Sequence, residues 1–245
     1  DTNDDEAYGF AMKIYNNDFS LPALSAYGHN GIHFEQGLHG GIYVYRNRFD
    51  KYNRPITFST SSTALIQGQE DIYIYYNLFT DVRLSGTGWF GYCFDINMAV
   101  ATTMDNVRIL NNVVYAPEAT LYAFIESNDA TTTVTNAMIR NNIVCNANQG
   151  VRLINGTVTT INVDNNNFYN VSTVTNYTGA TVTGDTYNNN ITTDPTFVTN
   201  GSDFHLQAGS PCINAGIDVG LTTDYDGRAV DNPPEIGAYE YKNKT

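Results

Sequence analysis

Positive charge is scarce in this chain. Only 12 of its 245 residues are Lys or Arg, against 25 Asp or Glu, which gives a formal net charge of -13 and a pI near 4.4. A protein that holds a nucleic-acid backbone needs a positive footprint, because the phosphate charges must be neutralised. The charge balance therefore argues against a nucleic-acid partner.

Long apolar runs and cysteines are scarce too. No run of 18 or more apolar residues exists, so no membrane insertion is expected, and the opening residues DTNDDEAYGF lack the basic and apolar regions of a signal peptide. Three cysteines are too few for a disulfide framework, and the one candidate bridge joins Cys145 and Cys212. The acidic, charge-poor composition suits a protein that is secreted or held at the cell surface, with any export signal already removed.

The chain does contain a repeated phrase of eight residues. Its versions are MKIYNNDF, IYVYRNRF, IYIYYNLF, VRILNNVV, AMIRNNIV, INVDNNNF and GDTYNNNI. Most versions carry apolar residues five and three positions before a shared asparagine and two after it, which is the alternation of a strand with one buried face. The asparagines are 30, 30, 35, 30, 24 and 23 residues apart, at Asn17, Asn47, Asn77, Asn112, Asn142, Asn166 and Asn189.

Such intervals are coil lengths of a solenoid. A helical interpretation fails because apolar residues do not recur at three and four, and because the units are rich in β-branched and aromatic residues. We therefore predict an all-β, right-handed parallel β-helix of about seven to eight coils. Asparagines stacked about 4.8 Å apart on successive coils would form a ladder of amide hydrogen bonds, so we expect them to be structural.

Residues 1–245 are expected to form one domain, as all-β chains of this length commonly do. Residues 1–11 are interpreted as an N-terminal lead-in or a remnant of a cap, and residues 192–245 as the last coil and a C-terminal cap. In this last segment the phrases DPTF, DFHLQAGSPCINAG, TDYDG and IGAYEY follow one another. Together they resemble the C-terminal ending of secreted bacterial right-handed parallel β-helix proteins of the pectate-lyase-like superfamily. The resemblance implies the fold and a secreted setting, but no reaction.

Positions two and four before the asparagine point outward in this register. On the first three coils, five of these positions hold tyrosines that are candidates for substrate binding: Tyr15, Tyr43, Tyr45, Tyr73 and Tyr75. Exposed aromatic faces in a row can stack on sugar rings, whereas the alternative is aromatic packing between coils. Beside them lie five of the twelve basic residues of the chain: Arg46, Arg48, Lys51, Arg54 and Arg83.

A basic cluster in an acidic chain would attract a carboxylated polysaccharide, which arginine can hold bidentately. A lyase must neutralise the uronate, remove its C5 proton and protonate the leaving oxygen. Arg46 and Arg48 are candidates for substrate binding, and the catalytic candidates are Lys51, Arg54, His33 and Arg83. The alternative is a set of solvated charges balanced by neighbouring carboxylates.

Carboxylates offer a hydrolytic alternative, because glycosidases need two acids at a set separation. The candidates are Asp71, Asp81, Asp95, Glu126 and Asp129, but we expect no close Asp–Asp pair on neighbouring strands and rank elimination above hydrolysis. For calcium, the loop TTDYDGRAVD offers Asp224 and Asp226, and the alternative there is a tight Asp–Gly turn.

Two hypotheses stay open at this point. The first is an extracellular carbohydrate-active protein that binds an acidic polysaccharide along the Tyr/Arg/Lys face of coils one to three, or cleaves it by β-elimination. The second is a non-catalytic, adhesin-like or structural surface or fibre protein that uses the same face for glycan contact or self-association. The residues do not decide whether the chain is an enzyme.

Overall fold

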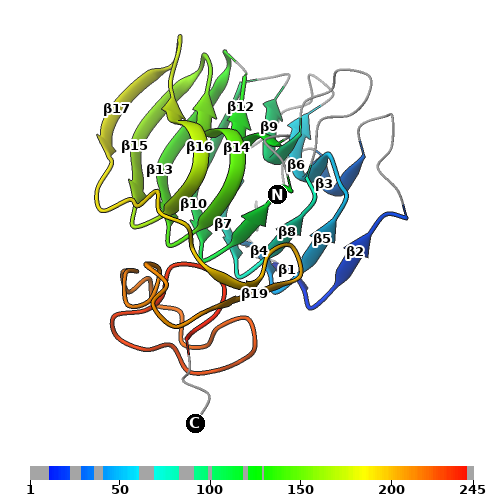
Figure 1. The fold of residues 1–245 in the computed structure, drawn as a ribbon. Coiled ribbons are helices and arrows are strands. Elements are labelled where there is room, and N and C mark those ends of the chain that lie inside the picture. The colour runs from blue at the N-terminus through cyan, green and yellow to red at the C-terminus, as the bar shows by residue number, and fades with distance from the viewer. Residues whose placement is uncertain are drawn as a thin grey trace, which may run out of the picture.

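The computed structural model describes residues 11–22, 29–35, 41–60, 69–82, 91–98, 101–117, 121–128 and 130–241. Their regular structure is all β, and successive coils pair through parallel strands, which confirms the predicted parallel β-helix (Figure 1). Within these ranges, no helix is long and apolar enough to cross a membrane.

The first sheet receives one strand from each coil. Its seven strands, in spatial order, are β1 (Met12–Tyr15), β4 (Ile42–Tyr45), β7 (Gln69–Tyr75), β10 (Thr102–Leu110), β13 (Thr132–Arg140), β15 (Thr157–Asp164) and β17 (Thr181–Thr186). Neighbours pair in register, so that Ile42 lies beside Met12 on one side and Ile72 on the other. The sheet order therefore repeats the order of the phrases in the sequence.

The second sheet consists of two rows of strands. The first row holds β2 (Asp18–Ser20), β5 (Arg48–Asp50), β8 (Leu78–Thr80) and β11 (Val113–Tyr115). The second row holds β3 (Asn30–Glu35), β6 (Arg54–Thr60), β9 (Tyr92–Met98) and β12 (Leu121–Ser127). The long strands β14 (Ile143–Leu153) and β16 (Asn167–Asn176) contribute to both rows. Their pairing makes the two rows one sheet.

The buried side chains stack by type inside the coils. Val44 and Ile74 are register partners and both are buried, as the alternation predicts. The rings of Phe19, Phe49 and Phe79 stack with centroid separations of 4.9 and 5.1 Å. Each coil thus places the same kind of side chain on its neighbour, and this repetition forms one continuous apolar core.

Asparagine amides form a hydrogen-bonded row at the bend between the two sheets. In each coil the asparagine Nδ2 donates to Oδ1 of the next asparagine at 3.0 or 3.1 Å, through the series Asn17, Asn47, Asn77, Asn112, Asn142, Asn166 and Asn190. The last member is Asn190, so the assignment of Asn189 to this position was wrong. Asn189 has a φ of 53° and forms the left-handed bend that precedes the row in each coil, as Asn165 does with a φ of 53°.

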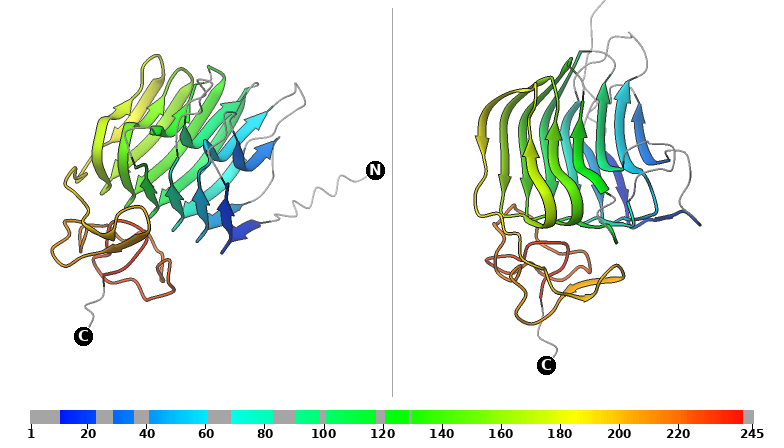
Figure 2. Two further views of the ribbon diagram at one scale, coloured as in Figure 1. Left: turned by 45° about the vertical axis from the view of Figure 1, so that its right-hand side comes forward. Right: turned by 45° about the horizontal axis from the view of Figure 1, so that its top comes forward.

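The C-terminal segment, residues 192–241, lies along the flank of the coils. The views in Figures 1 and 2 place it beside the bends between the sheets. It contains the antiparallel strands β18 (Phe197–Thr199) and β19 (Asp203–Leu206). Bend side chains of successive coils donate to its carbonyl oxygens: Asn111 to Gly237 at 3.0 Å, Asn141 to Ile217 at 2.8 Å and Asn165 to Ala215 at 3.0 Å. The segment interpreted as a last coil and cap therefore contacts the side of several coils.

The three cysteines are free and buried, so the candidate bridge between Cys145 and Cys212 is not formed. Burial in apolar surroundings raises the pKa of all three thiols. Cys145 and Cys212 instead belong to a second apolar cluster, which also contains Tyr76 and Phe204 and lies between the coils and the C-terminal segment. The segment is thus attached by apolar packing as well as by hydrogen bonds.

Candidate functional site

The tyrosine row on the first sheet is a set of stacked rings. Tyr15, Tyr45 and Tyr75 stack with centroid separations of 4.9 Å and interplanar angles of 3°, and Tyr43 stacks on Tyr73 at 5.0 Å. Each contact turns a ring face toward the neighbouring coil, and burial raises the pKa of Tyr75 to about 12. This geometry is the packing between coils that was the alternative to sugar stacking. Glycan binding by these tyrosines stays a prediction.

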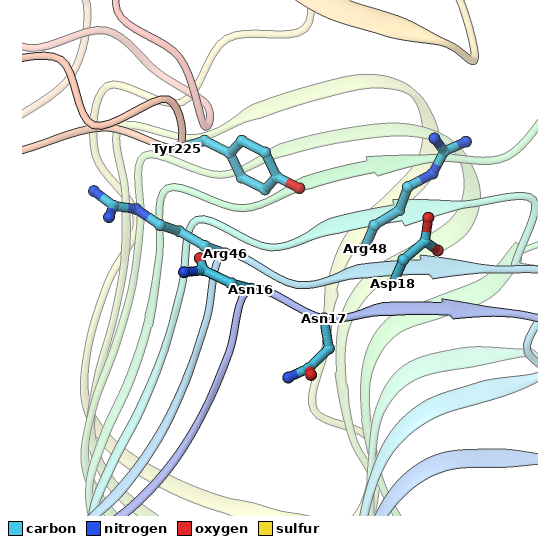
Figure 3. A pocket seen from close by; sticks show the side chains of 6 residues that line it. All are labelled: Asn16, Asn17, Asp18, Arg46, Arg48 and Tyr225. Carbon is cyan, nitrogen blue, oxygen red and sulfur yellow. The ribbon is translucent and has the colours of Figure 1, made fainter.

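The basic cluster divides over different surfaces. Arg46 donates from Nη2 to the carbonyl oxygen of Asp224 at 2.6 Å, so it holds the C-terminal segment. Arg48 lines a pocket of ≈ 380 Å³ in which the ring of Tyr225 lies between Arg46 and Arg48 (Figure 3). Lys51 forms an ion pair with Asp50 at 2.8 Å. Arg83 lies outside the described residues.

Arg54 and His33 lie on the second row of strands, away from the tyrosines. Arg54 Nη1 is 3.2 Å from Asp95 Oδ2, and His33 Nε2 is 2.5 Å from Ser59 Oγ. His33 also contributes a positive field at Asp95, where it acts to lower the carboxyl pKa. Of the four catalytic candidates, Arg54 therefore contacts Asp95, whereas His33 lies two strands away in register, beside Thr57.

That carboxylate belongs to an outward row of register partners on the second sheet. The row runs across β3, β6, β9, β12, β14 and β16 and consists of His33, Thr57, Asp95, Glu126, Arg152 and Asn176. Asp95 and Glu126 are direct partners on neighbouring strands. We expected no close Asp–Asp pair on neighbouring strands, and the structure holds an Asp–Glu pair there instead.

An arginine lies at each end of the acid pair. Arg54 pairs with Asp95, and Arg152 Nη1 donates to Glu126 Oε1. Two tyrosines of the same strands lie beside Arg152: its guanidinium is 5.4 Å from the ring centre of Tyr122, which contacts Tyr92 edge-on at 5.8 Å. The acid pair is thus enclosed, with Asp95 5% exposed and Glu126 2% exposed.

Glu126 is buried and incompletely paired. Its Oε2 has no hydrogen-bond partner within the described part of the chain, although buried polar atoms in proteins are nearly always paired. Burial, reinforced by the charge of Asp95, raises the pKa of Glu126 to about 7 despite the opposing charge of Arg152. Burial also raises the pKa of Asp95, and Arg54 opposes this effect. Near neutral pH, Glu126 can therefore hold a proton or release it.

Two carboxyl groups at register-paired positions of neighbouring strands can exchange protons with a bound molecule, one as acid and the other as base. Placing Asp95 opposite Glu126 does not stabilise the fold, because like charges opposite each other on neighbouring strands are destabilising. The structural alternative is a row of buried ion pairs that links four coils, whose desolvation cost offsets much of its attraction. Such a structural row does not explain why two carboxyl groups, those of Asp95 and Glu126, are placed opposite each other at its centre.

The predicted calcium ligands have other contacts in the structure. Asp224 is buried, and its two oxygens accept the backbone N–H groups of Arg228 and Glu240 at 2.7 and 2.9 Å. Asp226 Oδ2 lies 3.0 Å from His205 Nε2 and 3.4 Å from Arg228 Nη2. Asp224 therefore closes the tight turn that was the alternative to calcium, and calcium at these two residues stays a prediction.

Comparison of the chain with protein-family models, curated proteins and solved structures gives no match. The resemblance of its C-terminal phrases to secreted β-helix proteins therefore stays an expectation.

Proposed function

We propose that this protein is a secreted carbohydrate-active enzyme that cleaves an acidic polysaccharide on the outward face of β6, β9, β12 and β14. The observation that carries the proposal is the register pair of Asp95 and Glu126 on neighbouring coils. In this role Glu126 donates a proton to the glycosidic oxygen, and Asp95 accepts a proton from the attacking water or attacks the sugar itself. The saccharide would lie across the strands, along the stacking direction of the coils, and would have to displace the side chains that bury the two carboxyl groups.

The neighbouring residues support an acidic substrate. With Glu126 protonated, the positive charges of Arg54 and Arg152 outweigh the negative charge of Asp95. This face then carries a net positive charge in a chain that is otherwise strongly acidic. Protonation of Glu126 leaves Arg152 without a charged partner, so a uronate carboxylate could take the Arg152 donors bidentately. The hydroxyl groups of Tyr92 and Tyr122 would offer hydrogen bonds at the edge of the same surface.

The sequence ranked elimination above hydrolysis as the reaction, but the acid pair favours hydrolysis. In elimination an arginine neutralises the substrate carboxylate, but Arg54 is already engaged by Asp95. Lys51, a candidate base, follows β5 of the first row of strands and pairs with Asp50. Hydrolysis needs only the two carboxyl groups and a water molecule.

The reaction can be identified with a panel of pectate, alginate, glycosaminoglycans and neutral glycans. We expect new reducing ends on an acidic member of the panel without absorbance at about 235 nm, because hydrolysis leaves no unsaturated uronate. Reducing ends together with that absorbance would replace hydrolysis by elimination at this face. No product on any glycan would refute the enzymatic proposal and favour the non-catalytic surface protein.

A further inference from the structure

Three carboxylates meet in the C-terminal segment, away from the acid pair. One oxygen each from Asp231, Glu235 and Glu240 lies within 4.8 Å of the other two. Glu235 and Glu240 are each 2% exposed, whereas Asp231 lies at the surface. The cluster therefore has two buried members and one side that opens to solvent.

One oxygen of the Glu235 side chain lacks a hydrogen-bond donor, while a backbone hydrogen bond from Tyr241 reaches the same carboxylate. Its Oε2 is buried without a hydrogen-bond partner, and no arginine or lysine of the described ranges forms an ion pair with Glu235 or Glu240. Glu240 has two contacts through the backbone: its Oε2 accepts the N–H of Asp231 at 2.9 Å, and its own N–H donates to Asp224. Burying carboxylates without a compensating charge is very unfavourable. The buried oxygen of Glu235 thus requires a positive partner or a proton.

We propose that Asp231, Glu235 and Glu240 bind a calcium ion. Hard carboxylate oxygens are the ligands that calcium prefers, at about 2.4 Å, so two of its ligands are separated by at most about 4.8 Å. The three oxygens already lie within that separation. Magnesium bonds are about 2.1 Å long and demand a near-ideal octahedron with several retained waters, so three fixed carboxylates suit magnesium less well than calcium. Water at the exposed side of Asp231 would complete the shell of calcium.

The position of the cluster suggests what the ion does. The Gly237 N–H donates to the carbonyl oxygen of Asn141 at 2.8 Å, and Asn111 Nδ2 donates to the Gly237 carbonyl oxygen at 3.0 Å. Residues 235–240 are therefore attached to the bends of two neighbouring coils. Calcium bound to Glu235 and Glu240 would fix this stretch on the coils and stabilise the whole C-terminal segment. The inference is independent of the reaction proposed for Asp95 and Glu126.

The competing occupant is a proton. Burial and the neighbouring Glu240 carboxylate raise the pKa of Glu235 to about 8, so a proton could neutralise the pair when no ion is bound. The two occupants differ in one measurable way, since only the ion makes stability depend on the calcium concentration.

Calorimetric titration of the chelator-treated full chain with calcium chloride, at about pH 7.5, tests this inference. We expect saturable binding at one site, a higher Tm with calcium and weaker binding of magnesium. Asp231→Asn, a change at the surface, should weaken calcium binding by roughly tenfold or more. Glu235→Gln should abolish binding and is the second variant, while Asp218→Asn, at an exposed aspartate of the same segment, is the matched control and should bind as the wild type does.

Two results would overturn the calcium site. One is the absence of both calcium-dependent heat and a Tm shift at millimolar calcium, which would leave the proton as the occupant. The other is calcium binding that Asp226→Asn abolishes and Asp231→Asn leaves unchanged. That result would place the ion at Asp224 and Asp226, the ligands predicted from the sequence.

Discussion

Glu126→Gln is expected to lower the rate of polysaccharide cleavage about 10³-fold, because general acid catalysis contributes about 10²- to 10⁴-fold. Glutamine has the same size as glutamate and keeps an oxygen for Arg152, but it cannot donate a carboxyl proton. Asp95→Asn should have a comparable effect, since the amide is neither a base nor a nucleophile. The measurement is kcat on the polysaccharide that the panel identifies.

Asp164→Asn is the matched control for these variants. Asp164 is buried and pairs with Arg140 at 3.1 Å, much as Asp95 pairs with Arg54, but it belongs to the other sheet. This change should lower stability while the activity of the folded fraction stays at the wild-type level. Equal activity losses in Asp164→Asn and Glu126→Gln would show that the acid pair is structural.

The pH dependence of cleavage follows from the protonation of Glu126. The general acid acts in its protonated form, and the pKa of Glu126 is raised to about 7. The rate should therefore fall as the pH rises through about 7, and this alkaline limb should be absent from the residual activity of Glu126→Gln.

Asn112→Ala is expected to lower the free energy of unfolding by about 4 kcal/mol, because several buried polar groups lose their partners at once. The Asn112 side chain is fully buried and donates to the Ile74 carbonyl oxygen and to Asn142 Oδ1. Its oxygen accepts the backbone N–H and the side-chain amide of Asn77. Urea unfolding of the full chain measures the loss.

Asn17→Ala tests whether position in the row decides that loss. Asn17 is the first asparagine of the series, its side chain is exposed, and its Nδ2 donates to the Tyr15 carbonyl oxygen and to Asn47. Removing it takes away one of two donors to Asn47 Oδ1, because the Asn17 backbone N–H still donates to that oxygen at 3.1 Å, so we expect a loss of about 1 kcal/mol. Equal losses at Asn17 and Asn112 would contradict the account of the buried row.

The fold could be predicted because the same pattern of buried residues and asparagine recurs from coil to coil along the sequence. Each version of the phrase covers one strand, the bend and the start of the next strand, and stacked coils must repeat buried residues such as Val44 and Ile74. The last version was shifted by one residue because NNN offers three asparagines to one bend. The left-handed φ of Asn189 and the hydrogen bond from Asn166 to Asn190 together identify Asn190 as the member of the row.

The acid pair could not be found from the same repeat. Asp95 lies 18 residues after Asn77, but Glu126 lies 14 residues after Asn112. The connections between the two rows of strands differ in length, so a register counted from the asparagines is lost before β9 and β12. Asp95 and Glu126 were both candidates, but their pairing depends on that register.

The tyrosines and arginines are grouped in the sequence, but those that the structure describes do not form one binding surface. Tyr43 and Tyr73 point outward as predicted, yet stacking between coils occupies their ring faces. Arg46 and Arg54 are close in sequence, but the bend and the next strand direct one to the C-terminal segment and the other to Asp95. Closeness in sequence therefore overstated how many charges share one surface.

The most direct test of the central claim, that Asp95 and Glu126 form an acid–base pair, is an NMR titration of the Glu126 side-chain carboxyl carbon. The raised pKa of about 7 predicts a shift change centred there, and Asp95→Asn should move the midpoint lower by removing the neighbouring negative charge. A midpoint at the ordinary glutamate value of about 4.3, unchanged by Asp95→Asn, would contradict the account.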